Sequence, residues 1–232
     1  MTANGLIIEN SKITGNEIPS EKSSVSVDIP KGISSVGEGA FCGCNNILAV
    51  SIPEGVLAIE DRAFQSCTGL ESILIPKSAQ YIGNLAFEYC ENLRTAVILN
   101  GVRAIGDSAF AKCRGLSSVS FPDSVTFIGG GAFFSCESLS SVSVPESVRA
   151  IGEDAFAYCK SLRIAVMENG VTSIGARAFE SCEMLDTVLI PESVTSIGED
   201  AFAGCERLRI LTPSGSAAEK YAKENSIPLT IL

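Results

Sequence analysis

Cysteine recurs every 23 residues along most of this 232-residue chain, without one change of step. A phenylalanine stands three residues before each of these cysteines, and an alanine stands just before each phenylalanine. Self-similarity at a fixed period of about 20–50 residues marks a repeat protein, in which each unit buries its apolar face only against its neighbours. We name the recurring thiols the cysteine ladder: Cys44, Cys67, Cys90, Cys113, Cys136, Cys159, Cys182 and Cys205.

Two apolar periodicities alternate inside each unit. Ile59, Ala63, Phe64, Cys67 and Leu70 have the spacing of a buried stripe on an amphipathic helix, which predicts one short helix per unit. The residues that follow step by two and predict a strand of three or four residues with one buried face. In five units the strand ends at a proline, which has no N–H to donate: Pro53, Pro76, Pro122, Pro145 and Pro191.

Stacked units would pair their strands about 4.8 Å apart in one parallel sheet. Because a helical arc is wider than a strand, the stack would curve with the sheet on its concave side. The sequence therefore predicts an α/β solenoid with a parallel concave β-sheet and a short helical or irregular convex side.

The repeated string also resembles a known family. One unit reads Phe64-x-x-Cys67-x-x-Leu70-x-x-Ile73-x-Ile75-Pro76-x-x-Ala79-x-x-Ile82-Gly83-x-x-Ala86. This string resembles the 23-residue leucine-rich repeat of the BspA-like (treponemal-type) family, and the resemblance covers about four-fifths of the chain. It implies a right-handed leucine-rich-repeat superhelix. It also implies a bacterial secreted or cell-surface protein that binds proteins or host surfaces.

An open solenoid exposes an apolar section at each end and needs caps. We expect one structural domain with an N-terminal cap at 1–26, about eight units at 27–213 and a C-terminal cap at 214–232. Ser216 and Glu219 have the spacing of a capping box, which predicts a helix over 217–223. A last strand over 228–232 would pair at the edge of the sheet.

The ladder thiols share the predicted stripe with Phe and Leu, so we interpret them as small buried hydrophobes of the core. A metal site is not expected, because the thiols would point inward in parallel and the chain has no histidine. Disulfides between neighbouring units are not expected either, since their Cβ atoms would point the same way. Cys42 lies outside the ladder and is predicted near the surface. The sequence indicates no cofactor.

The formal net charge of −10 and the pI of about 4.6 argue against nucleic-acid and anionic-membrane partners. No apolar run reaches the roughly 18 residues of a membrane span, so membrane insertion is not expected. The first residues do not read as a signal peptide, which leaves the compartment open between secreted or cell-surface and cytoplasmic.

Catalysis has little support in this chain. Without histidine there is no ordinary Ser-His or Cys-His nucleophile, so we expect a protein that is not an enzyme. The acid pairs Glu60-Asp61, Glu153-Asp154 and Glu199-Asp200 fall where helices would start and are explained by the helix dipole. A glycan-acting enzyme with two carboxylates across a cleft is the remaining catalytic alternative.

If the function is binding, the outward positions of the predicted concave strands should carry it. These positions include two apolar groups, Leu74-Val97-Leu99 and Ile164-Val166-Leu189, with small polar residues between them. Exposed apolar patches often mark contact sites, although branched side chains also simply favour strands. The candidate ligand-binding residues are Leu74, Thr95, Val97, Leu99, Ser118, Ser120, Ser141, Ser143, Ile164, Val166, Glu168 and Leu189.

Residues 93–102 and 162–171 are similar to each other and lie three units apart. Both lack the proline and continue into an Asn-Gly turn. Duplication of three units explains the spacing; the alternative is two equivalent docking points flanked by Arg94 and Arg163. Two functions remain open, a surface module that binds a protein or host-surface ligand and an intracellular scaffold of the same shape. We expect a monomer in either case.

Overall fold

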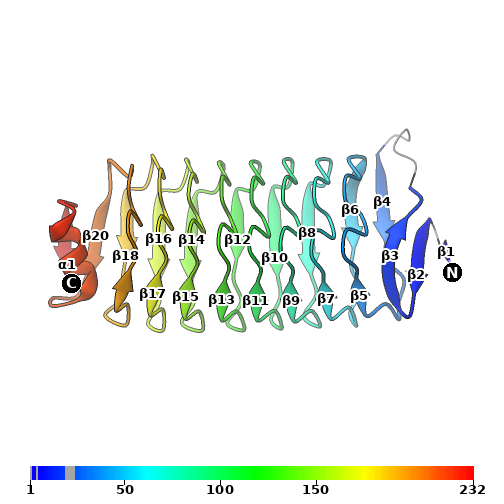
Figure 1. Ribbon diagram of the computed structural model, residues 1–232, viewed down its shortest axis with the longest axis horizontal. Coiled ribbons are helices and arrows are strands. Elements are labelled where there is room, and N and C mark those ends of the chain that lie inside the picture. The colour runs from blue at the N-terminus through cyan, green and yellow to red at the C-terminus, as the bar shows by residue number, and fades with distance from the viewer. Residues whose placement is uncertain (1, 4, 19–23) are drawn as a thin grey trace.

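The computed structural model describes residues 2–3, 5–18 and 24–232. Over these residues the chain forms a parallel-strand β-solenoid of about nine turns, with very little helix. The coils lie side by side, and in the view of Figure 1 the stack runs straight from the N-terminal strands to the C-terminal helix. The solenoid architecture agrees with the prediction from the period, whereas the secondary structure within each coil differs from the predicted one.

The predicted strands form one side of every coil. They are divided between two five-stranded sheets, where the sequence predicts one continuous sheet. We name their outer surface the long-strand face. The first sheet contains β4 (Val25–Asp28), β6 (Ile47–Ser51), β8 (Ser72–Ile75), β10 (Thr95–Ile98) and β12 (Ser118–Ser120). The second contains β14 (Ser141–Val144), β16 (Ile164–Met167), β18 (Thr187–Leu189), β20 (Arg209–Thr212) and β21 (Leu229–Ile231).

An eleven-stranded sheet that the sequence did not predict forms a second side. It begins with antiparallel strands β1 (Thr2–Ala3), β2 (Leu6–Glu9) and β3 (Lys12–Asn16). The rest are two-residue parallel strands, one per coil, whose outer surface we name the short-strand face. They are β5 (Ser35–Val36), β7 (Ala58–Ile59), β9 (Tyr81–Ile82), β11 (Ala104–Ile105), β13 (Phe127–Ile128), β15 (Ala150–Ile151), β17 (Ser173–Ile174) and β19 (Ser196–Ile197).

The short helix predicted in each unit is replaced by turns. Ile59 belongs to β7, while Ala63, Phe64 and Cys67 lie in consecutive turns. The N–H of Gln65 bonds the carbonyl of Arg62 within the coil, but the N–H of Phe64 bonds Ala86 of the next coil at 2.8 Å. Successive N–H groups of this turn therefore bond alternately within the coil and to the next coil. Arg62 and Ser66 have positive φ angles of 56° and 59°, which end any helix.

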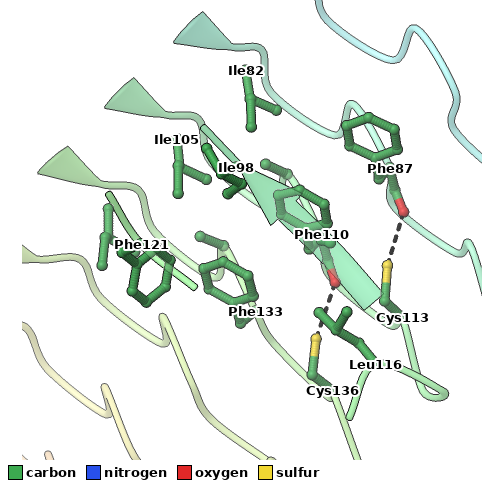
Figure 2. Packing of buried hydrophobic residues seen from close by; sticks show 14 of the residues in the cluster. Ile82, Phe87, Ile98, Ile105, Phe110, Cys113, Leu116, Phe121, Phe133 and Cys136 are labelled. Atoms are coloured by element: carbon green, nitrogen blue, oxygen red, sulfur yellow. Dashed lines mark hydrogen bonds between the residues drawn. The ribbon is translucent and has the colours of Figure 1, made fainter. Parts of the chain in front are cut away.

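Stacked phenylalanine rings form the centre of the core. From Phe41 to Phe202, the ring of each coil stacks on the next with centroids 5.0–5.3 Å apart and planes within 12° of parallel. Aromatic pairs at this separation gain roughly 0.5–1.5 kcal/mol beyond simple burial. Figure 2 shows Phe87, Phe110 and Phe133 in this column beside the strand residue Ile98. The period of 23 residues is thus the length of chain that places each ring directly over the ring of the preceding coil.

The cysteine ladder makes hydrogen bonds that a purely apolar residue could not. From Cys67 to Cys205, each Sγ lies 3.0–3.2 Å from the carbonyl oxygen of a phenylalanine in the preceding coil. Two of these contacts, Cys113 to Phe87 and Cys136 to Phe110, are drawn in Figure 2. The same Phe87 carbonyl accepts the N–H of Cys90 at 3.1 Å. The thiol therefore satisfies the second lone pair of a buried carbonyl.

A helix and a final strand lie at the C-terminal end of the solenoid. The helix α1 (Ala217–Glu224) exceeds the predicted 217–223 by one residue, and the Ser216 hydroxyl accepts the N–H of Glu219 at 3.1 Å. Strand β21 pairs with β20 beyond it. At the other end β4 begins at Val25, two residues before the predicted boundary at 27. Residues 1, 4 and 19–23 of the predicted N-terminal cap lie outside the described residues.

The stacked column predicts a large difference between two phenylalanines of this chain. Phe110→Ala should lower the free energy of unfolding by about 3–5 kcal/mol, because it opens a cavity between two stacked rings. Phe127→Ala should cost less than about 1 kcal/mol, because Phe127 is 43% exposed. Urea unfolding followed by circular dichroism measures both. Equal losses would show that the column is not the main source of stability.

Candidate binding surface

The structure places every predicted concave-face residue on the outer side of the long-strand face. Their alternating partners, such as Ile73 and Ile75, point into the core. Leu99 and Glu168 lie directly after β10 and β16 rather than within them. The exposed candidates are Leu74, Thr95, Val97, Leu99, Ser118, Ser120, Ser141, Ser143, Ile164 and Glu168, whereas Val166 and Leu189 are half-buried.

The first apolar group joins two neighbouring strands. Leu74 of β8 is in direct register with Val97 of β10, and Leu99 follows on the same side. Leu74 and Val97 are 51% and 44% exposed, although side chains of this kind are normally buried. In the second group Val166 of β16 pairs in register with Leu189 of β18, and Ile164 is 47% exposed. Each group is therefore contiguous in space.

Serines separate the two groups. Ser118 and Ser120 lie on β12, and Ser141 and Ser143 lie on β14, so they meet where the first five-stranded sheet ends and the second begins. The long-strand face thus consists of two apolar areas divided by a small polar strip.

The two Asn-Gly turns have the same backbone but different chemistry. Gly101 and Gly170 have φ angles of 143° and 145°, and a Cβ on either would lie 1.9 Å from a carbonyl oxygen of the preceding coil. Only glycine fits there. Lys77 and Leu99 border the first turn, whereas Glu146 and Glu168 occupy the corresponding positions at the second. The two turns are therefore equivalent in backbone geometry but not in side-chain chemistry.

A groove of about 630 Å³ opens at the second turn. Its apolar lining includes Val166, Leu189, Pro191, Pro213 and Leu232. Three acids also line it: Glu146, Glu168 and Glu192. Val166, Glu168 and Leu189 were all among the candidates from the sequence. The groove itself was not foreseen, because Pro213 and Leu232 come from the C-terminal end of the chain.

Arg94 and Arg163 lie one residue before β10 and β16 and are both exposed. The guanidinium of Arg163 is 3.9 Å from the carboxylate of Asp186. Pairs that are this exposed contribute little stability. Since each precedes a strand of the long-strand face, both arginines flank that face.

Sequence reasoning missed the exposed side chains of the short-strand face. Tyr81 and Phe127 are each 43% exposed, and both stand in register with Ala104 of the coil between them. The signal was the two-residue alternation before each repeated glycine, where Ile82 and Ile128 are buried and the residue before them is not. It was overlooked because Ile59 and its equivalents were assigned to a helix.

The cysteines have the surroundings of core residues. Six ladder thiols are buried, Cys44 and Cys205 are half-buried, Cys42 is exposed, and all nine are free. Burial raises the pKa of the Cys159 thiol to about 12 and also raises the pKa values of Cys113 and Cys136. A thiol that stays protonated is a poor nucleophile and a poor metal ligand. Among the described residues no group of three or more His, Cys, Asp or Glu could hold a metal ion.

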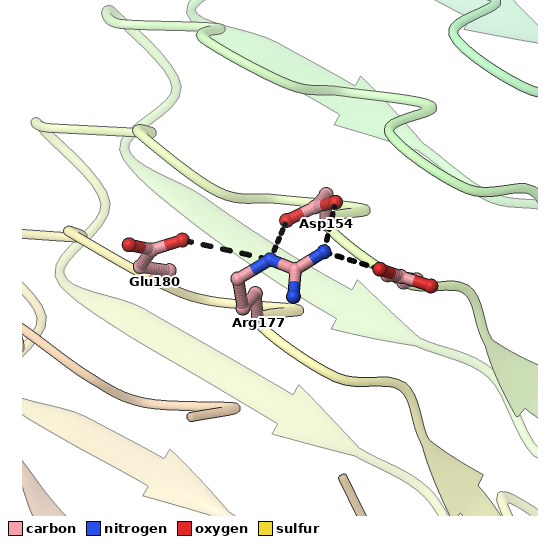
Figure 3. A network of polar contacts seen from close by, with 4 residues as sticks. Asp154, Arg177 and Glu180 are labelled. Atoms are coloured by element: carbon pink, nitrogen blue, oxygen red, sulfur yellow. Dashed lines mark hydrogen bonds and ion pairs between the residues drawn. The ribbon is translucent and has the colours of Figure 1, made fainter. Parts of the chain in front are cut away.

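The acid pairs lie in turns rather than at helix starts, so a helix dipole cannot explain them. The Glu153-Asp154 pair instead binds Arg177, whose Nε and Nη2 lie 3.0 and 3.2 Å from the two oxygens of Asp154 (Figure 3). Glu153 also contacts Nη2, and Glu180 is 4.0 Å from Nε. The hydrogen bonds that Arg177 donates to Asp154 raise the pKa of Arg177, so its guanidinium stays charged. These carboxylates are occupied by a cation of the chain itself.

Glu60, of another acid pair, is also held by a cation. Partial burial acts to raise the pKa of its carboxyl, but hydrogen bonds from Lys12 and Ser35 bring it below the ordinary value. Asp61 accepts the N–H of Asn84 in the next coil at 2.8 Å. The Glu60 side chain thus reaches Lys12 of β3, two strands away from β7, and the Asp61 side chain links neighbouring coils.

The fold and its repeated strand define this chain as a leucine-rich-repeat solenoid. The sequence profile described as "BspA type Leucine rich repeat region" matches residues 12–136 and 80–209. The chain belongs to the BspA-type leucine-rich repeat family. No match was found among the curated proteins.

Two solved structures resemble the chain. A leucine-rich cell surface protein from Faecalibacterium prausnitzii is 34% identical with a TM-score of 0.56, over 85% of this chain and 62% of that protein. A leucine-rich repeat protein from T. pallidum is 26% identical with a TM-score of 0.55, over 68% of this chain and 85% of that protein. The chain thus spans less than two thirds of the F. prausnitzii protein. Among the described residues, no helix has the length and apolar character to cross a membrane.

The burial of the thiols predicts their reactivity. Native protein treated with a thiol reagent at pH 8 should show one fast group, Cys42, and slower reaction at the half-buried Cys44 and Cys205. All nine thiols should react once the chain is unfolded in guanidinium. Cys42→Ser should remove the fast phase and leave the rest unchanged. Thiols that appear only after reduction would show that the ladder is oxidised.

The raised thiol pKa values also predict a loss of stability in alkali. Thiols such as Cys113 and Cys159 have higher pKa values when folded than when unfolded, so their contribution is complete below the unfolded value of about 8.5. It is lost as the pH rises toward the folded values, because the unfolded chain releases protons first. The urea midpoint should therefore fall between pH 8 and pH 10. A midpoint that rises over this interval contradicts the burial of protonated thiols.

Proposed function

We propose that this chain is a non-catalytic binding module that docks a protein or host-surface partner on its long-strand face. The observation that carries the proposal is the pair of apolar groups on neighbouring strands, of which Val97 and Val166 are the centres. A regular sheet holds these side chains in fixed positions, so little entropy is lost when a partner binds. The core needs none of them, because each points away from it.

The proposed place of action is the surface of a bacterium. Its support is the F. prausnitzii relative, a cell surface protein 34% identical to this chain. An intracellular scaffold of the same fold is the second candidate, and the free thiols favour it because unpaired cysteines persist in a reducing cytosol. Antibody labelling of intact cells against permeabilised cells separates the two locations.

A binding rather than catalytic role is supported by the acids of the turns. A glycosidase needs two carboxylates across a cleft, about 5–9 Å apart. The Glu153-Asp154 pair instead neutralises Arg177, and Glu60 binds Lys12. The family and its structural neighbours support the same reading. Turnover of any member of a glycan panel would overturn it.

The proposal predicts which substitutions abolish binding. Val97→Asp and Val166→Asp should leave the far-ultraviolet circular dichroism unchanged, because both side chains lie on the outer face, and the urea midpoint should fall only slightly at the half-buried Val166. Binding to an array of purified secreted and cell-surface proteins should weaken at least about tenfold for either variant, since a partner would have to bury an unpaired charge.

Phe127→Asp is the matched control, because it places the same charge at an exposed apolar position of the short-strand face. It should bind like the unmodified protein. Equal binding by all three variants would exclude the long-strand face as the docking surface. Loss of binding in Phe127→Asp alone would move the site to the other sheet.

A further inference from the structure

We propose that the groove at the second Asn-Gly turn binds a segment of a partner protein in which Leu, Ile or Val lies beside Lys or Arg. This inference rests on the proposed function, since it specifies the chemistry of one part of the long-strand face. It starts from three features of the groove: an apolar wall, a rim of acids, and a second turn of the same backbone elsewhere in the chain, where the corresponding residues carry no net charge.

The apolar wall provides the contact for a branched side chain. Val166 and Leu189 stand in register on neighbouring strands, and Pro191 and Pro213 continue the wall beyond the strand ends. The groove volume of about 630 Å³ lies within the range of about 300–1,000 Å³ typical of ligand sites. It can therefore receive one or two aliphatic side chains in contact with the wall.

The acids provide the charge. Glu146, Glu168 and Glu192 line the groove, and none of them belongs to an ion pair within the described parts of the chain. The nearby Arg149 donates from Nη1 to the carbonyl of Gly170 at 3.1 Å. The acids of the turns differ in this respect, because Glu153 and Asp154 are paired with Arg177. Three unpaired carboxylates on a chain of net charge −10 attract a cationic partner.

The repeat sets the spacing of the rim. Glu146 and Glu192 occupy the same position two coils apart, which is roughly 10 Å at about 4.8 Å per coil. In an extended peptide, side chains on one face recur about every 6.8 Å. The long side chains of Lys and Arg cover the remaining distance, so basic residues on both sides of an apolar residue can reach the two carboxylates.

The first Asn-Gly turn supplies an internal comparison. Its backbone matches that of the second turn, with Gly101 and Gly170 each donating to a serine hydroxyl at 2.9 and 3.1 Å. Lys77, Leu99 and Asp123 replace the three acids there. A ligand that required only the turn or an apolar strand surface would bind at both places. A cationic ligand should bind at the second alone.

The test uses three fluorescein-labelled peptides and fluorescence polarisation with the full chain. The peptides are Gly-Arg-Leu-Val-Leu-Lys-Gly, its charge-reversed form with Glu in place of Arg and Lys, and a polar form with Ser-Thr-Ser at the centre. The first should bind at least tenfold more tightly than the other two. Its affinity should fall between 50 and 300 mM salt, because screening weakens the attraction of the carboxylates.

Two double variants assign the binding to the groove. Glu168→Gln with Glu192→Gln should weaken the first peptide at least tenfold and remove most of the salt dependence. Val166→Ser with Leu189→Ser should weaken it by a similar factor but keep the salt dependence. Val97→Ser with Leu99→Ser is the matched control at the first turn, and it should bind the peptide like the unmodified protein.

Equal affinity for the charge-reversed peptide, or no effect of the glutamine substitutions, overturns the proposed groove chemistry. If that happens while Val97→Asp and Val166→Asp still abolish binding on the protein array, the long-strand face remains the docking surface and only the partner chemistry is wrong. A loss of peptide binding in the first-turn control as large as in the groove variants also overturns the assignment to the groove.

Discussion

Registry between coils is the constraint on which the rest of this structure depends. Each coil bonds its neighbour through backbone groups, as the N–H of Phe64 does with Ala86, and stacks one phenylalanine on the next. A coil of another length would displace both the rings and the hydrogen bonds. Glycines are required where coils approach closely: a Cβ on Gly83 would lie 2.5 Å from the nitrogen of Asp61 in the preceding coil. The period is therefore a condition of packing.

The same constraint explains the use of cysteine. Turns that bond alternately within a coil and to the next leave the Phe87 carbonyl close to the core, where it accepts one N–H and has a second lone pair. The thiol of Cys113 occupies little space and donates to that oxygen. A larger apolar side chain would leave the lone pair unpaired and crowd the ring column. The ladder thus serves the backbone of the turns, and burial raises the pKa of thiols such as Cys113 and Cys159.

Outward positions are not subject to this constraint, and the coils differ in their side chains there. The two Asn-Gly turns share a backbone fixed by Gly101 and Gly170, yet one carries Leu99 and the other Glu168. Such differences are compatible with the stack, because Leu99 and Glu168 are both exposed. A repeat fold of this kind can therefore keep its architecture while each outer area takes on its own binding chemistry.

By itself the sequence determined the stacking unit, its 23-residue register, the inward and outward sides of the long strands, and the helix that Ser216 caps, since all of these follow from local spacing. Only the tertiary structure decided that Phe64 and Cys67 lie in turns and that Ile59 belongs to a strand of a second sheet. It also decided that Val166, Pro213 and Leu232 line one groove. The apolar spacing of the turns is shared by a helix. Hydrogen bonds to a neighbouring coil and contacts between distant segments leave no local pattern, because both arise only when the coils are stacked.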